Sequence, residues 1–139
     1  MADMRTKYHS QWAGQFYAAA ELTRRGYLVS FTLGNAPSTD LHVTSPRGRD
    51  FRVEVKTQRT KNFWILRGHP PDKDLLYVLV FVPPEEAPTF WVMTCADTQR
   101  LRKLYEERMT ARGTYRDDLG GFNWTGPHDH EGRWDVLPP

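Results

Sequence analysis

The fold of this chain is decided by the stretch DLHVTSPRGRDFRVEVKTQ, residues 40–58. Its second half alternates apolar and polar side chains, which is the period of a β-strand with one buried face. Phe51, Val53 and Val55 are therefore expected to face a core. The opposite face carries four polar side chains, those of Arg52, Glu54, Lys56 and Gln58. The pattern predicts a rigid strand that holds an acid and an ammonium group side by side.

A tight turn precedes this strand. Residues 45–50 read Ser-Pro-Arg-Gly-Arg-Asp, a composition typical of turns, so residues 40–44 are expected to fold back as the first strand of a hairpin. The hairpin brings the carboxylate of Asp40 within reach of Glu54. Two oxygen donors beside the ammonium of Lys56 are suited to holding a divalent metal and activating water.

The order of these residues resembles the PD-(D/E)XK nuclease superfamily, whose motif is an acidic residue at a strand start, a hairpin, and then Glu-x-Lys. In this chain, thirteen residues separate Asp40 from Glu54-Val55-Lys56. Each of these residues also has a simpler interpretation. Asp40 could cap a turn, and Glu54 and Lys56 could pair on a solvated sheet face.

The resemblance extends upstream to residues 14–27, GQFYAAAELTRRGY. This segment is similar to the first helix of the resolvase-like and intron-endonuclease-like branches, which carries a further metal-site glutamate, and Glu21 would be that residue. Glu21 also lies four residues before Arg25, the spacing of an ion pair on a helix surface. Without the rest of the motif, the ion pair would be the preferred interpretation.

The resemblance implies a deoxyribonuclease that depends on a divalent metal, Mg²⁺ or Mn²⁺. The implied metal ligands are Glu21, Asp40, Glu54 and the carbonyl of Val55. Lys56 would orient the attacking water and stabilise charge on the phosphate, and Gln58 would position the phosphate or water. Because one domain offers one such site, cutting both strands would need a homodimer or two visits. The alternatives are an inactive nuclease-like module for DNA binding or assembly, and an interaction protein whose aromatic tail docks on a partner.

Positive charge gathers along the same stretch, although the formal net charge of the chain is only +2. The predicted DNA-binding residues are Arg47, Arg49, Arg52, Arg59, Lys61 and Arg67. Such clustering attracts phosphates and offsets the repulsion between carboxylates. The alternative is that these are ordinary loop and edge-strand cations, which keep a sheet soluble.

The rest of the chain predicts an α/β fold, with a restriction-endonuclease-like mixed central sheet flanked by an N-terminal and a C-terminal helix. The expected elements are a helix over 3–25, strands over 27–33, 40–44, 51–58, 75–82 and 89–94, and a helix from after Asp97 to near Gly113. Residues 34–39 are expected to be a loop, and 63–66 are expected to be extended. The strand over 75–82 is apolar throughout, which predicts that it is central and covered on both faces.

Three further expectations concern packing. The buried side of the first helix is predicted to carry Trp12, Phe16, Ala19, Ala20 and Thr23. The tail from about residue 114 is predicted to be an irregular cover anchored by Phe122, Trp124 and Trp134. Cys95, the single cysteine, is predicted to be a buried, inert thiol at the end of a strand.

The length of 139 residues predicts a single domain spanning 1–139. The longest apolar run, residues 75–82, is less than half of a membrane span, and the N-terminus lacks the apolar core of a signal peptide. A cytoplasmic protein without membrane contact is therefore expected.

Overall fold

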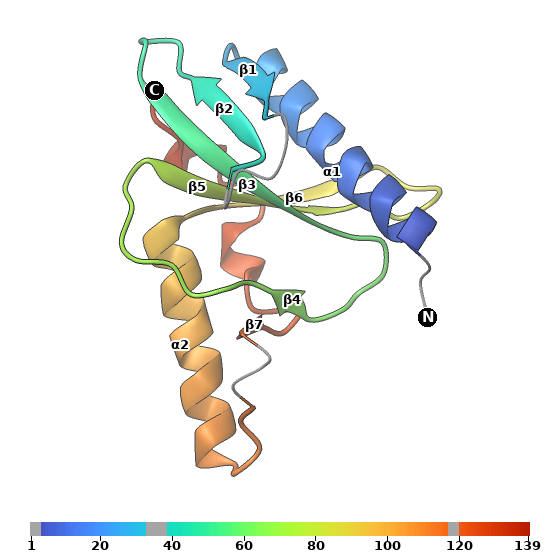
Figure 1. Ribbon diagram of the computed structural model, residues 1–139, viewed down its shortest axis with the longest axis vertical. Helices are drawn as coiled ribbons and strands as arrows, with labels where there is room; N and C mark the ends of the chain where they lie inside the picture. The colour runs from blue at the N-terminus through green and yellow to red at the C-terminus, as the bar shows by residue number, and fades with distance from the viewer. Residues whose placement is uncertain (1–3, 33–38, 117–119) are drawn as a thin grey trace.

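The computed structural model describes residues 4–32, 39–116 and 120–139. Figure 1 shows an α/β arrangement in which two helices lie on opposite sides of a twisted sheet. The elements are α1 (Met4–Arg24), β1 (Leu28–Phe31), β2 (Leu41–Thr44), β3 (Asp50–Gln58), β4 (Trp64–Ile65), β5 (Leu75–Phe81), β6 (Thr89–Thr94), α2 (Cys95–Ala111), β7 (Gly121–Phe122) and two 3₁₀ turns, His128–His130 and Trp134–Val136. The predicted fold class is confirmed. The expected loop over 34–39 falls mostly outside the described residues.

The main sheet has five strands in the order β1-β2-β3-β5-β6. β2 and β3 form the predicted hairpin, with Leu41 opposite Val53, and the pairs β1–β2 and β5–β6 are also antiparallel. β3 and β5 are parallel. A parallel pair needs a crossover, and residues 59–74 supply it. The sheet is therefore mixed, as predicted.

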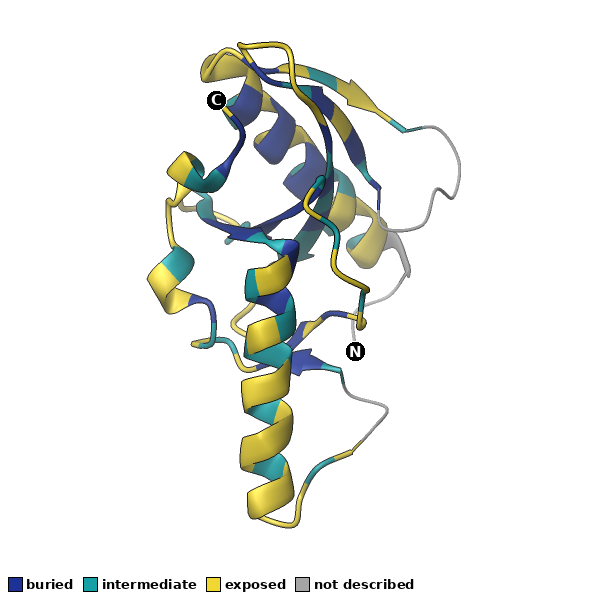
Figure 2. Cartoon of the chain, turned by 90° about the vertical axis from the view of Figure 1, so that its left-hand side faces the viewer, coloured by how far each residue is buried: buried dark blue, intermediate teal, exposed yellow. Residues whose placement is uncertain are grey.

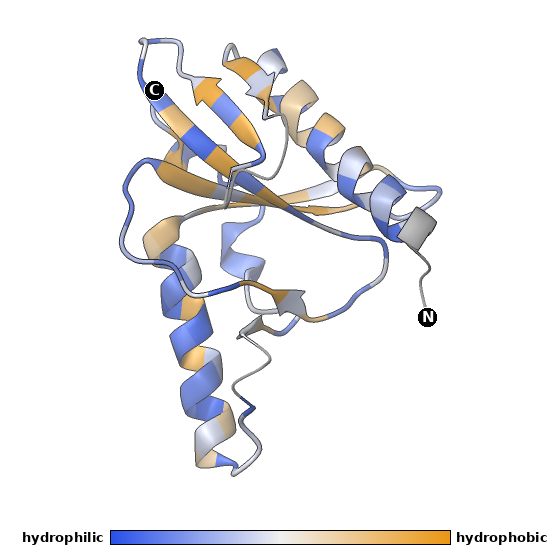
Figure 3. Cartoon of the chain, in the orientation of Figure 1, coloured by the Kyte–Doolittle hydropathy of each residue, from blue (hydrophilic) through white to orange (hydrophobic). Residues whose placement is uncertain are grey.

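The alternation along β3 and the continuous apolar run of β5 are visible in Figure 3. Phe51, Val53 and Val55 are buried, as their spacing predicts, and residues 75–80 of β5 are buried without a break. Leu76, Val78 and Val80 of β5 belong to one buried cluster, and the alternate residues Leu75, Tyr77 and Leu79 belong to another, so both faces of this strand are covered. The two strands together divide the interior into two layers.

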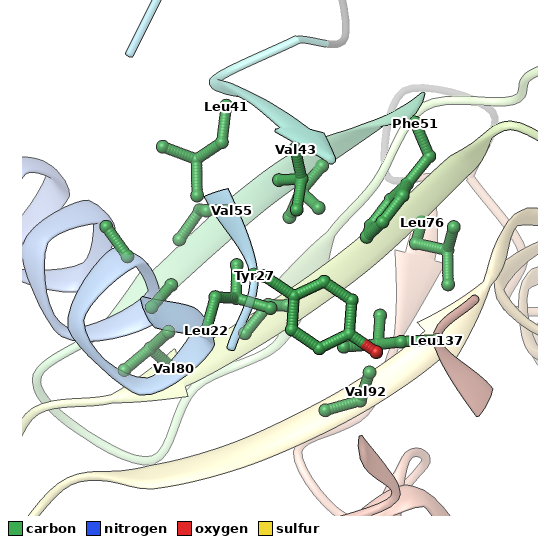
Figure 4. Close-up of a cluster of buried hydrophobic side chains, with 14 residues drawn as sticks. Leu22, Tyr27, Leu41, Val43, Phe51, Val55, Leu76, Val80, Val92 and Leu137 are labelled. Atoms are coloured by element: carbon green, nitrogen blue, oxygen red, sulfur yellow. The ribbon is translucent and has the colours of Figure 1, made fainter. Parts of the chain in front are cut away.

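One layer lies between the sheet and α1, and the other lies between the sheet and α2. The first, shown in Figure 4, joins Leu22 of α1 to Val53, Val78 and Val92 of the sheet, and Leu137 closes it from the tail. The second layer is built on Trp64, Leu75, Tyr77, Leu79, Trp91, Met93, Cys95 and Phe122. Because adjacent residues of β3 point into different layers, the strand presents Glu54 and Lys56 to the side opposite α1.

The buried face of α1 differs from the predicted one. Its buried residues are Gly14, Gln15, Ala18, Ala19 and Leu22. Of the residues predicted to be buried, only Ala19 is; Phe16, Ala20 and Thr23 are exposed and Trp12 is partly exposed. The physical reason is backbone proximity: a Cβ placed on Gly14 would lie 1.8 Å from Oγ1 of Thr57 in β3, so only the small-residue face fits against the sheet.

α2 begins at Cys95, earlier than predicted. Thr94 is its N-cap, and Thr94 and Asp97 form a reciprocal capping box in which each side chain accepts from the backbone N–H of the other, at 3.0 Å in both cases. Cys95 is therefore the first helical residue rather than a strand end, but it is buried as expected. Figure 2 shows that the distal part of α2 extends away from the sheet and is largely exposed.

The tail is more regular than predicted, because it contributes β7, which pairs with β4 in a separate two-stranded sheet. The extended segment predicted over 63–66 thus finds its partner in the tail. Two of the predicted anchors pack in the second layer, where Phe122 is buried and Trp124 stacks on Trp64 with centroids 5.4 Å apart. The third, Trp134, packs against Phe90. Among the described residues, neither helix has the length and apolarity needed to cross a bilayer.

Candidate active site

Asp40 is held at the point where β2 begins. Its backbone N–H donates to the carbonyl of Val53 at 3.0 Å, and its carboxylate Oδ2 accepts from the N–H of Val55 at 2.7 Å. The carboxylate therefore accepts the hydrogen bond that a further residue of β2 would have accepted from β3, just beyond the last pair of the two strands, Leu41 and Val53. The main chain of Asp40 is fixed from the other side by Thr32, whose N–H donates to its carbonyl at 3.1 Å.

The carbonyl of Val55 points to the same edge of β3. Arg52 donates its N–H to Asp74, and Gln58 accepts from Val82, so even-numbered residues of β3 direct their peptide groups towards β5. The alternate residues, Val55 among them, direct theirs towards β2. Because β2 begins only at Leu41, opposite Val53, the Val55 carbonyl faces the open edge beside Asp40.

Glu54 and Lys56 share one face of β3, and Nζ of Lys56 lies 3.1 Å from Oε1 of Glu54. Glu54 is paired in register with Tyr77 of β5. Burial, and then the nearby charge of Glu54, raise the pKa of the Tyr77 hydroxyl well above its usual value, so it stays protonated beside the carboxylate. The strand alternation thus produces the predicted acid–ammonium pair.

Asp40 interacts electrostatically with Glu54 and Lys56. Its pKa is raised above the ordinary aspartate value, chiefly by burial. The N–H of Val55 and the charge of Lys56 act in the opposite direction, and the charge of Glu54 adds to the rise. Glu54 and Lys56 are therefore close enough to influence the pKa of Asp40, and a carboxyl group with a shifted pKa is common at functional sites.

These residues open into a cavity of about 740 Å³. Its floor is the end of β3 from Glu54 to Gln58, and the following loop contributes Arg59, Thr60 and Asn62. Another part of its wall comes from the first half of α1, through Thr6, Lys7, Ser10 and Gln11. The sequence reasoning missed this wall, although two polar pairs at i, i+4 spacing mark a polar stripe there.

Glu21 does not line this cavity. Its carboxylate accepts hydrogen bonds from Nε of Arg24 and Nε of Arg25, each at 3.2 Å. The hydrogen bond from Arg24 lowers the pKa of Glu21, although its partial burial acts in the opposite direction. The structure places Glu21 in the helix-surface ion pair that was the alternative to a metal-site role.

Gln58 lines the cavity, but its side chain is engaged with the protein. Its amide nitrogen donates to the carbonyl of Phe63 at 2.9 Å. Phe63 closes the loop that contains Arg59. Gln58 therefore helps to fix the loop at the cavity mouth; its contact with phosphate or water stays a prediction.

The predicted cationic cluster is spread over the length of the hairpin. Arg59 lines the cavity. Arg47 and Arg49 belong to the turn at the other end of β3, about 26 Å away for an eight-residue rise, and Arg49 pairs with Asp74 at 3.0 Å. Arg52 pairs with Asp72. Lys61 and Arg67 are exposed on the crossover.

Within the ranges 4–32, 39–116 and 120–139, no three His, Cys, Asp or Glu side chains are grouped to hold a metal. The donors at the open edge of β3 are the carboxylates of Asp40 and Glu54 and the carbonyl of Val55. This set fits Mg²⁺, which binds through one or two carboxylates and keeps several waters. It is a poor match for zinc, whose protein sites are built mainly on Cys sulfur and His nitrogen.

No family model matches the chain, and no curated protein matches it. Its structure is similar to that of a bacterial homing endonuclease, I-Ssp6803I, with a TM-score of 0.50 and 22% sequence identity over 69% of this chain and 68% of that one. At this identity the likeness concerns the fold and says nothing further about individual residues. The chain therefore shares its mixed α/β fold with that endonuclease.

Proposed function

We propose that this protein is a divalent-metal-dependent nuclease of the PD-(D/E)XK type, which hydrolyses phosphodiester bonds in DNA. The observation that carries the proposal is the meeting of Asp40, Glu54 and Lys56 at one cavity edge, from a hairpin whose sequence matches the motif. The nuclease-like fold is consistent with it.

The proposed ligands for Mg²⁺ or Mn²⁺ are Asp40, Glu54 and the carbonyl of Val55. When bound, the ion supplies Lewis-acid chemistry at the phosphate and a more acidic water. Asp40 is suited to this role because its hydrogen bond from Val55 fixes the carboxylate while burial and Glu54 leave it electrostatically unfavourable without a cation. Glu21 is not included, because its carboxylate is occupied by Arg24 and Arg25.

Lys56 is proposed to act on the reacting phosphate. Its ammonium is held 3.1 Å from Glu54 on a strand, so its position is set before substrate arrives. A preorganised positive group stabilises negative charge that develops on phosphate oxygens in the transition state. Glu54 would thereby serve both as a ligand and as the group that orients Lys56.

The cavity walls are proposed to bind the DNA backbone. Lys7 from α1 and Arg59 from the crossover face the cavity from two sides. Such cations attract phosphates and fix the register of the strand without reading its sequence. The hydrogen bond from Gln58 to Phe63 would keep Arg59 in place by closing its loop.

One observation favours a second candidate, an inactive nuclease-like module that binds DNA. Only two carboxylates meet at the cavity among the described residues, and Glu54 already has Lys56 as its partner without a metal. A binding module would need the cations of the cavity and would have no use for the open edge beside Val55. The same purified protein distinguishes the two candidates.

The test is nicking of supercoiled plasmid with Mg²⁺ or Mn²⁺, against a chelator control. We expect cleavage that Asp40→Asn, Glu54→Gln and Lys56→Ala each abolish, with DNA binding largely retained. Asp50→Asn is the matched control, because Asp50 is an exposed acid at the other end of the same strand. It should cleave normally.

Cleavage that survives both chelation and Lys56→Ala would show that another site or a contaminant is responsible. Binding of DNA and Mg²⁺ without cleavage of plasmid, duplex, branched or single-stranded substrates would favour the inactive module. Absence of DNA binding at low salt would exclude both candidates.

A further inference from the structure

An exposed aromatic patch lies beside the cavity. We define the α1 aromatic patch as Tyr8, Trp12 and Phe16 of α1 together with Phe31 of β1. Neighbouring rings are in contact, with centroids 6.3 Å apart for Tyr8 and Trp12 and 5.5 Å apart for Phe16 and Phe31. Tyr8 is 60% exposed, Phe16 57% and Phe31 36%. Contiguous exposed aromatic rings are unusual on a soluble surface and indicate a binding role.

The patch is continuous with the cavity through two elements. On α1, Lys7 and Gln11 line the cavity and are the immediate sequence neighbours of Tyr8 and Trp12. On β1, Phe31 is paired with Leu41, the residue after Asp40. The rings and the cavity therefore share α1 and the start of β2, so a strand of nucleic acid bound in the cavity would pass close to the rings.

The charge around the patch suits nucleic acid. Residues 4–20 and 26–32 contain no aspartate or glutamate, whereas Lys7 lies next to the patch. Basic side chains interleaved with aromatic rings are the combination by which proteins hold single strands, because every base offers a π-face to stack on. In an intact duplex the bases are stacked on one another and the rings would have nothing to bind.

We infer that the α1 aromatic patch stacks the unpaired bases of a DNA strand that enters the cavity, so that single-stranded DNA, a single-stranded branch or the unpaired stretches of a supercoiled plasmid are preferred over a relaxed, fully paired duplex. This inference rests on the proposed nuclease function and specifies its substrate class. The proposed stacking groups are Tyr8 and Phe16, the two most exposed aromatic residues of the patch, and the rings of Trp12 and Phe31 both contact the ring of Phe16.

A second copy of this chain is a weaker candidate for the patch. A fully exposed aromatic side chain presents about 200 Å², so the exposed parts of Tyr8, Phe16 and Phe31 together offer about 300 Å² of ring surface. A stable protein interface buries about 800 Å² on each partner. The patch is large enough for two or three bases and small for a dimer.

The test compares binding of a labelled oligothymidine and of a blunt duplex, with EDTA present to prevent cleavage. The double variant Tyr8→Ala with Phe16→Ala should bind the oligothymidine about 25-fold more weakly, taking the low end of the effect of a base–aromatic stack for each ring. Its affinity for the blunt duplex should not change. Tyr8→Phe with Phe16→Tyr, which keeps both rings, should retain wild-type affinity.

Tyr17→Ala is the matched control, since Tyr17 is on the same helix and 47% exposed but belongs to no ring contact of the patch. It should bind both probes normally. Unchanged oligothymidine affinity in the folded double variant would overturn the inference and leave the nuclease proposal intact. Failure of the wild-type protein to bind either probe would instead contradict the nuclease proposal. Loss of a dimer in sedimentation, with unchanged DNA affinity, would assign the patch to self-association.

Discussion

Replacing Gly14 by alanine tests the contact that sets α1 against the sheet. The added methyl carbon would lie 1.8 Å from Oγ1 of Thr57 and 2.8 Å from its Cβ and Cγ2, whereas ordinary contact begins near 3.4 Å. A new rotamer of Thr57 moves Oγ1 and Cγ2 but cannot move Cβ. The clash can therefore be relieved only if the helix or the strand moves.

The expected change in stability is a balance of two effects. Alanine gains about 1 kcal/mol over glycine inside a helix, whereas overpacking costs about 1–3 kcal/mol, and more when the backbone must shift. Because the backbone must shift here, we expect Gly14→Ala to lower the free energy of unfolding by about 2 kcal/mol. This corresponds to a decrease of about 6 °C in Tm for a domain of this size.

The assay is thermal and urea unfolding followed by circular dichroism, with Ala20→Gly as the reference. Ala20 is exposed on the same helix, so its replacement should report helix propensity alone and cost about 1 kcal/mol. A gain of about 1 kcal/mol for Gly14→Ala would refute the close packing of α1 on β3. Because α1 carries one wall of the cavity, plasmid cleavage by Gly14→Ala should also fall by more than its folded fraction explains.

Four further outcomes are expected. In chelator, Asp40→Asn should raise Tm, because it removes one of two neighbouring carboxylates that burial and repulsion make unfavourable without a metal; an unchanged or lower Tm would contradict this. Thr94→Ala should lower the free energy of unfolding by about 1 kcal/mol in urea titrations, since it removes the N-cap of α2. Burial alone would raise the pKa of Asp97, but hydrogen bonds with Thr94 lower this pKa overall. The ionised carboxylate of Asp97 therefore stabilises the fold fully above the unfolded pKa, and this stabilisation is lost as the pH falls through the lower folded pKa. The difference in stability between wild type and Asp97→Asn should shrink as the pH falls below about 4. Arg59→Ala should reduce the salt slope of DNA binding by about 1, whereas Arg47→Ala should leave it unchanged, because only Arg59 lines the cavity.

The hairpin and the central strand could be predicted because their determinants are local. The alternation over 51–58 fixes which side chains of β3 share a face, and the turn at 45–50 fixes its partner. The unbroken apolar run of β5 indicates burial on both sides. Asp40, Glu54 and Lys56 could be brought together by this reasoning alone, because all three lie on one hairpin.

The face of α1 could not be predicted in the same way. The helix carries two candidate stripes, one with large aromatic rings and one with small residues, and periodicity favours the rings. The sheet selects the small residues, because Gly14 and Ala18 allow the helix backbone to approach β3. The prediction of Glu21 as a metal ligand also depended on which face of α1 packs on the sheet, since helix spacing alone cannot place its side chain relative to the hairpin.

The positions of the cations in space could also not be predicted from the sequence. Arg47 and Arg59 are twelve positions apart in the chain, yet the extended strand between them carries them to opposite ends of the hairpin. Arg49 pairs with Asp74 and Arg52 pairs with Asp72, and both acids lie at the end of the crossover. Closeness in sequence along a strand therefore overstates closeness in space.

The crossover from β3 to β5 has no strand partner until β7 has been synthesised. Within the described residues β4 pairs only with β7, through Trp64 and Phe122. On the ribosome, the crossover emerges well before residues 121–122, because the chain is made from its N-terminus. The hairpin with Asp40, Glu54 and Lys56 can form early, whereas β4 can pair only after residues 121–122 have emerged. Asp40, Glu54 and Lys56 would therefore come together before β4 finds its strand partner.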